Sequence, residues 1–159
     1  MSEAREIKLD RMRYTKNTTS SRLALLAIVF DVLFFISIYK SNVGTWYYNI
    51  LMGASIIYNL VFLLAAFLAS ESVKNYRAGY SWLMIALGVI QIVRIWIYPM
   101  TAHAAVVNNE PVMGDAQFIR CIIYLALSAA CLFAGAVVNT KKSRALSRHI
   151  SSLEAGKAA

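Results

Sequence analysis

The sequence predicts an all-α integral membrane protein, a four-transmembrane-helix bundle with both termini in the cytoplasm. Three observations support this prediction: the composition, the grouping of the apolar residues and the distribution of charge. The chain is 59% hydrophobic and 15% charged, whereas typical soluble domains are about 45–50% apolar and about 25% charged. The apolar residues fall into four blocks separated by polar segments, a pattern typical of a multi-pass protein of the cell membrane.

The first predicted span covers residues 23–39 and follows a polar, basic arm over residues 1–22. The arm shows no clean helical stripe, so we expect it to dock on another surface or to stay partly disordered. The span is at the short end of the roughly 17–25 residues that a membrane crossing needs. One acid, Asp31, lies near its midpoint, where a charge costs about 2.5–3.5 kcal/mol on insertion scales. Asp31 is therefore expected to have a partner or a specific purpose.

The other three spans of the bundle, which covers residues 23–139, are predicted from similar apolar runs. They cover residues 46–70, 80–99 and 118–138. Aromatic residues lie near their ends, as is usual at the headgroup boundary, and the third span is expected to end at a proline. The basic tail, residues 140–159, has apolar residues at helical spacing. It is expected to form either a short amphipathic helix on the inner leaflet or a solvated segment.

The basic residues indicate which way the chain crosses the membrane. Thirteen of the sixteen lie in the arm, the tail and the loop between spans two and three, whereas the two opposite loops contain Lys40 alone. Basic loops stay on the cytoplasmic side, so both termini are expected there. This distribution also explains the net charge of +8. We expect the basic termini to contact an acidic cytoplasmic partner or anionic lipid but not nucleic acid, since no aromatic platform accompanies them.

Polar residues of the first three spans are predicted to meet inside the membrane. At about 1.5 Å per helical residue, Asp31, Asn59 and Gln91 fall at nearly the same depth, and Arg94 lies one turn further out. Helical side chains lean toward the amino terminus, which directs Arg94 toward Asp31. We therefore expect an intramembrane polar cluster of these four residues. It is either a buried ion pair that fixes helix register, or a site where Asp31 carries a proton or cation or anchors a substrate amine.

Small residues on the fourth span form a candidate helix-packing face. Ala126, Ala130 and Ala134 are spaced four residues apart, and Gly135 lies beside them. Such rows let helices approach closely in lipid. The simpler interpretation is packing within the bundle, and the alternative is a docking face for another subunit.

The sequence predicts no catalytic site, cofactor site or metal site. Cys121 and Cys131 lie on one predicted helix about 15 Å apart, too far for a disulfide. His103, Glu110 and Asp115 share an outer loop, but their spacing is not typical of a metal site. The sequence also has no Cys-x-x-Cys pair and no phosphate-binding glycine loop. An enzyme is therefore the least favoured class.

Two functional hypotheses remain. The first is an accessory or structural subunit of a larger membrane assembly, such as a transport complex, bound to other subunits or to itself. The second is a small proton- or cation-coupled transporter that works as an oligomer, with Asp31 as the coupling acid.

Overall fold

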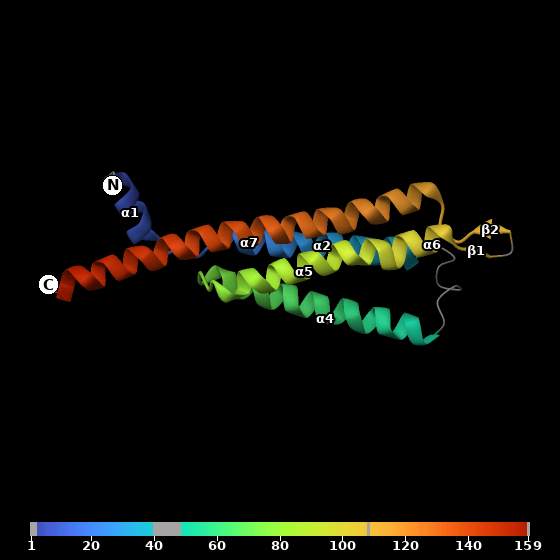
Figure 1. Ribbon diagram of the computed structural model, residues 1–159, viewed down its shortest axis with the longest axis horizontal. Helices are drawn as coiled ribbons and strands as arrows, with labels where there is room; N and C mark the ends of the chain where they lie inside the picture. Colours follow the sequence, from blue (N-terminus) through green and yellow to red (C-terminus); the bar gives the residue numbers. More distant parts are fainter. Residues whose placement is uncertain (1–2, 40–48, 108, 159) are drawn as a thin grey trace.

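The computed structural model describes residues 3–39, 49–107 and 109–158. Its elements, shown in Figure 1, are α1 (Glu3–Met12), α2 (Thr18–Tyr39), α4 (Asn49–Lys74), α5 (Gly79–Ile95), the π-helical turn η1 (Trp96–Met100), α6 (Thr101–Ala104), the short strands β1 (Val106–Val107) and β2 (Glu110–Pro111), and α7 (Asp115–Ala158). Four helical segments are long and apolar enough to cross a membrane. The predicted helical chain with four candidate spans is thus confirmed.

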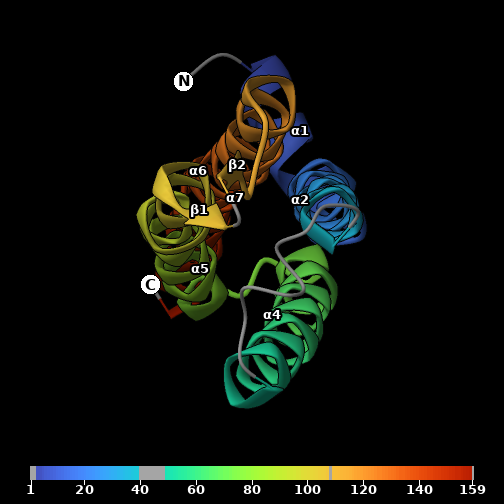
Figure 2. The same cartoon turned by 90° about the vertical axis from the view of Figure 1, so that its right-hand side faces the viewer.

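The four long helices run alternately up and down along one axis (Figure 1). Helix α7 packs against α2 and α5, and α4 packs against the same two helices. The end-on view in Figure 2 shows α7 and α4 at opposite corners of the bundle. Because the chain traverses the bundle four times, the two termini lie at the same end (Figure 1).

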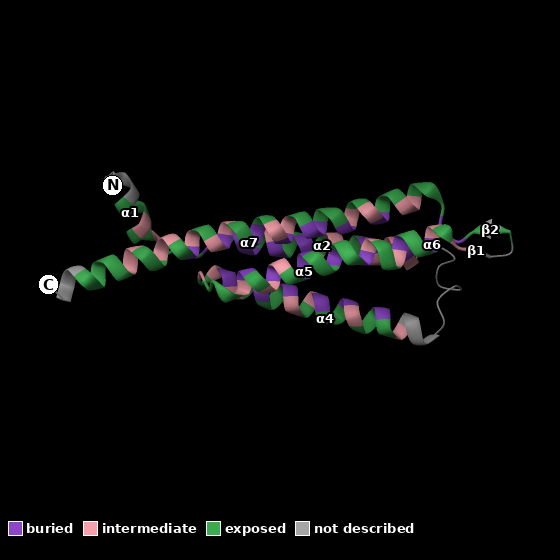
Figure 3. Cartoon of the chain, in the orientation of Figure 1, coloured by how far each residue is buried: buried purple, intermediate pink, exposed green. Residues whose placement is uncertain are grey.

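Two apolar clusters form the core. The one nearer the termini is rich in alanine, including Ala24, Ala27 and Ala66, each with no exposed surface. Small side chains let neighbouring helices approach closely. The second cluster, at the opposite end, packs Phe34 of α2 and Leu125 of α7 against the chain around the β1–β2 hairpin. Figure 3 shows exposed residues along the outside of the helices. Many of them are large and apolar, as expected where lipid is the solvent.

Several element boundaries differ from those predicted. Helix α2 begins at Thr18 and α4 continues to Lys74, while residues 46–48, assigned to the second span, lie outside the described residues. The third span does not end at Pro99. Proline has no N–H to donate to the preceding turn, and there the helix widens into η1 before it continues as α6. The π-helical turn η1 thus allows the helical segment to continue beyond Pro99.

Helix α7 extends far beyond the bundle. It contains 44 residues, a length of about 66 Å, whereas bilayer hydrocarbon is about 30 Å thick. The tail after residue 140 is therefore not a separate short helix, because residues 141–158 continue the last span as one helix. Helix α1 lies beside this extension (Figure 1), where Asp10 Oδ1 is 3.9 Å from His149 Nε2. The amino-terminal arm is thus largely helical.

A buried polar network holds the helices together where α7 leaves the bundle. Asn139 of α7 accepts a hydrogen bond from the Asn17 side chain (3.1 Å) and donates to Ser81 Oγ (2.9 Å) and to the Arg77 carbonyl (3.0 Å). The backbone N–H of Asn17 donates to the carbonyl of Lys74 at the end of α4 (2.9 Å). The start of α2, the end of α4, the start of α5 and the middle of α7 are thus linked.

Replacing Asn139 with alanine should destabilise the bundle by about 2–3 kcal/mol, because it leaves buried polar partners unsatisfied. Reversible unfolding of the purified protein in detergent measures the effect. The matched control is Asn75→Ala, since Asn75 is exposed in the α4–α5 turn and its loss should cost less than about 0.5 kcal/mol. Equal stability of the two variants would contradict a stabilising role for the network.

Candidate functional site

An ion pair between α2 and α5 lies at the centre of the bundle. Arg94 Nη1 donates to Asp31 Oδ1 at 2.6 Å, and the two side chains are only 3% and 1% exposed. Charge-assisted hydrogen bonds of this kind are shorter and stronger than neutral ones. Breaking such a buried pair by removing one partner is costly, because a lone charge is left in a medium that solvates it poorly.

Side chains from α4, α5 and α7 extend the hydrogen bonding around this pair. Gln91 of α5 donates to Asp31 Oδ1 (2.8 Å) and accepts from Arg94 Nη1 (2.9 Å). Asn59 of α4 accepts from Arg94 Nη2 at 2.8 Å. Ser128 of α7 accepts from Gln91 Nε2 (3.1 Å) and donates to the Ala27 carbonyl of α2 (3.0 Å). All four long helices therefore contribute to one polar cluster.

Aromatic rings surround the guanidinium group of Arg94. Its central carbon lies 4.6 Å from the ring centroid of Tyr58, 4.8 Å from that of Phe34 and 5.7 Å from that of Tyr98. Cations are attracted to the faces of such rings, and more strongly when water is absent. Arg94 Nε is buried and has no hydrogen-bond partner among the described residues. The aromatic rings thus provide favourable contacts for the buried guanidinium group, in which Nε has no hydrogen-bond partner among the described residues.

Each member of the predicted cluster reaches this centre from a regular helical position. Gln91 and Arg94 lie three residues apart on the buried face of α5, and residues at that spacing are neighbours on a helix surface. Asn59 is further held by a hydrogen bond from its Nδ2 to the Ser55 carbonyl one turn earlier (2.9 Å). The structure brings together all four residues proposed from the sequence. It adds Ser128 and the aromatic rings, which the sequence reasoning did not include.

The small-residue row of α7 does not pack inside the bundle. Ala126, Ala130 and Ala134 are all exposed, and only Gly135 is buried. A Cβ atom on Gly135 would lie 2.5 Å from Met84 Cε, so this glycine does permit a close helix contact. The interpretation of the alanine row as intra-bundle packing is wrong, because the core-facing side of α7 is formed by other residues, including Leu125 and Leu132.

The remaining candidate residues of the sequence are His103, Glu110, Asp115, Cys121 and Cys131. Among the described residues, no group of three His, Cys, Asp or Glu side chains is placed to bind a metal ion. His103 stacks on Phe118 and lies 3.8 Å from Asp115 Oδ1, while the side chain of Glu110 lies outside the description. Cys121 and Cys131 are both free thiols.

Comparison with known proteins gives no family for this chain. No protein-family model, curated protein or solved structure matches it. Function is therefore inferred from the geometry of the polar cluster, the outer surface of the bundle and the long α7 helix.

Removing one charge of the pair should destabilise the bundle more than removing both. We expect Asp31→Asn and Arg94→Gln each to cost about 3–5 kcal/mol, because each leaves one uncompensated buried charge. The double variant leaves no buried charge, so it should cost less than either single variant and therefore much less than their sum. Reversible unfolding in detergent checks this.

The control for these variants is Arg120→Gln, because Arg120 is an exposed arginine on α7 and its loss should change the stability by less than about 0.5 kcal/mol. Additive losses in the double variant would mean that Asp31 and Arg94 are not energetically coupled.

Proposed function

We propose that this protein is a non-enzymatic accessory subunit of a larger assembly in the cell membrane, and that it binds its partners through α7. In this proposal both termini face the cytoplasm. The placement is supported by the thirteen basic residues on the side of the termini, against Lys40 alone in the two opposite loops.

The observation that carries the proposal is the continuation of α7 beyond the bundle. Its residues 141–158 extend the last span as one helix, and α1 packs beside them. A continuous helix is a stiff projection, unlike a flexible tail. It holds basic side chains such as Arg144 and Arg148 in exposed positions. These side chains are electrostatically complementary to an acidic surface of a cytoplasmic partner.

The outward row of Ala126, Ala130 and Ala134 supports a second contact, within the membrane. All three residues are exposed, so another transmembrane helix can approach the α7 backbone closely there. In lipid, close packing of this kind drives helix association. A partner subunit would thus be held by the same helix in the membrane and in the cytoplasm, and a second copy of this chain could use the same row.

The coupled-transporter hypothesis receives less support from the geometry. A coupling carboxylate must exchange its proton or cation with both sides of the membrane. Asp31 is instead 1% exposed and bonded to both Arg94 and Gln91. Its burial and its hydrogen bonds favour a structural role, and we assign it that role.

The decisive experiment is gentle-detergent purification of the tagged protein from native membranes, followed by mass spectrometry of the co-purifying proteins. We expect recovery of at least one larger membrane protein in near-stoichiometric amounts. Ala130→Leu should reduce this recovery at least several-fold, because the larger side chain prevents close helix approach. Deletion of residues 145–159 should reduce it as well.

The matched control is Ala86→Leu, which makes the same change on an exposed position of α5 and should leave recovery unchanged. If the wild-type protein is recovered only with itself, the accessory-subunit proposal fails. Asp31→Asn would then be tested for loss of coupled flux in liposomes.

A further inference from the structure

Two adjoining hollows lie between α5 and α7 at the end where α7 leaves the bundle. The first, with a volume of about 430 Å³, is mostly apolar and includes Trp82, Ile85 and Val137 in its lining. The second, also about 430 Å³, is more polar and includes Arg144 and Arg148 in its lining. They meet at Ala78 and Arg144, two residues that line both. The two hollows together form one groove with an apolar half and a basic half.

The charged residues that line this groove are all basic. Lys141 and Arg144 line the apolar half at its edge, and Arg148 extends the basic lining. None of the described residues that line the two hollows is acidic. All three basic side chains are exposed, so they are free to reach a bound anion. The groove is therefore complementary to a ligand with an anionic group at one end and an apolar body at the other.

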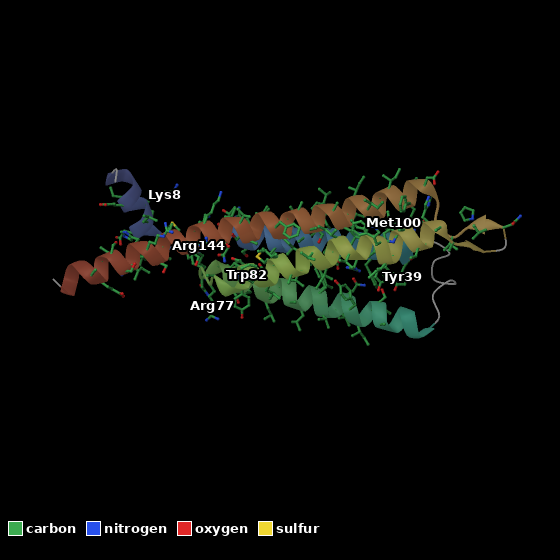
Figure 4. The ribbon with its side chains drawn as sticks, in the orientation of Figure 1. Lys8, Tyr39, Arg77, Trp82, Met100 and Arg144 are labelled. Atoms are coloured by element: carbon green, nitrogen blue, oxygen red, sulfur yellow. The ribbon has the colours of Figure 1, made fainter. Side chains whose placement is uncertain are left out.

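The position of the groove matches the boundary between hydrocarbon and headgroups. Trp82 lies in the first turn of α5 with 74% of its surface exposed, and exposed tryptophan is typical of this boundary. From Val137 to Arg144 the α7 helix rises about 10 Å, enough to cross from the hydrocarbon through the headgroup layer, which is about 5–8 Å thick. Figure 4 shows Trp82 and Arg144 at the same end of the bundle.

The start of α5 adds to the positive potential at this point. Its N-cap residue is Ala78, which lies between the two hollows and has no side chain that caps the first-turn N–H groups. The amino end of a helix carries a partial positive charge that favours anions. This contribution supplements the basic side chains of α7 and lies on the opposite wall of the groove.

From these observations we propose that the α5–α7 groove is a binding site for one anionic phospholipid. The phosphate group lies against Lys141, Arg144 and Arg148, and an acyl chain runs along Ile85 and Val137 beside Trp82. Basic pockets between transmembrane helices on the cytoplasmic side are the type of site that holds anionic headgroups. The site shares Arg144 and Arg148 with the cytoplasmic contact proposed above. It needs only the groove and the membrane, so lipid binding by the purified protein tests it separately from the partner.

Native mass spectrometry of the full-length protein in detergent tests the site, with phosphatidylglycerol and phosphatidylcholine of identical acyl chains as probes. We expect phosphatidylglycerol to bind about tenfold more tightly. The double variant Lys141→Gln/Arg144→Gln should lose most of this preference, since each basic residue near the surface adds to the attraction for anionic lipid. The matched control, Lys8→Gln/Lys16→Gln, removes two exposed charges at the same end but outside the groove, and should keep the preference.

A second pair of variants tests the apolar half without changing the charge. Val137→Trp fills the groove and should weaken phosphatidylglycerol binding several-fold, whereas Val89→Trp should not. The two valines are similarly exposed, at 51% and 49%, and both substitutions face outward.

The proposal is overturned if both lipids bind equally to the wild-type protein. It is also overturned if the Lys8/Lys16 control loses as much preference as the groove variant, which would indicate non-specific attraction to the basic end. Unchanged binding by Val137→Trp would likewise exclude the groove as the acyl-chain site. If the charge variant fails to fold, the two tryptophan variants still decide the question.

Discussion

The buried pair of Asp31 and Arg94 constrains the whole bundle. Once a carboxylate and a guanidinium group lie in a medium that solvates charge poorly, they must stay in contact, and their remaining hydrogen-bonding groups must also find partners. Gln91 of α5 and Asn59 of α4 bond to the pair directly, and Ser128 of α7 accepts a hydrogen bond from Gln91. A rotation or axial shift of any one helix would break at least one of these bonds, so the cluster defines the register of all four.

A membrane bundle needs such a constraint more than a soluble one does. Lipid tails are as apolar as leucine, and the apolar faces of the helices therefore have little preference for each other over lipid. The two apolar clusters supply close packing, but many axial offsets of alanine-rich helices pack nearly as well. The polar cluster and the Asn17–Asn139 network, at different depths along the axis, select one arrangement among them.

The sequence allowed the four spans and the members of the polar cluster to be predicted, because charge and amides in apolar runs are rare and their depth follows from helical rise. Ser128 could not be predicted in this way, since the free-energy cost of placing a serine in a transmembrane helix is small and such serines are common. The orientation of Ala126, Ala130 and Ala134 was predicted wrongly for a related reason. In a soluble helix polarity distinguishes the outer face from the core, but here both faces are apolar. Only the packed structure shows which side of α7 faces outward.

The length of α7 shows a similar limit of sequence reasoning. Lys141 and Lys142 mark the end of the apolar run, but the change from apolar to polar sequence does not by itself end a helix, because lysine, arginine and alanine all favour helix. The helix therefore continues. Where it leaves the bundle it is held by Asn139, which donates to Ser81 Oγ, and by Ser143, which donates to the Tyr76 carbonyl (2.8 Å). One rigid element thus connects the outward alanine row, the basic groove and the extension beyond the bundle. In the proposed role, the polar cluster keeps α7 fixed relative to the other helices through Ser128, so that a partner bound to α7 is held at a defined height and orientation.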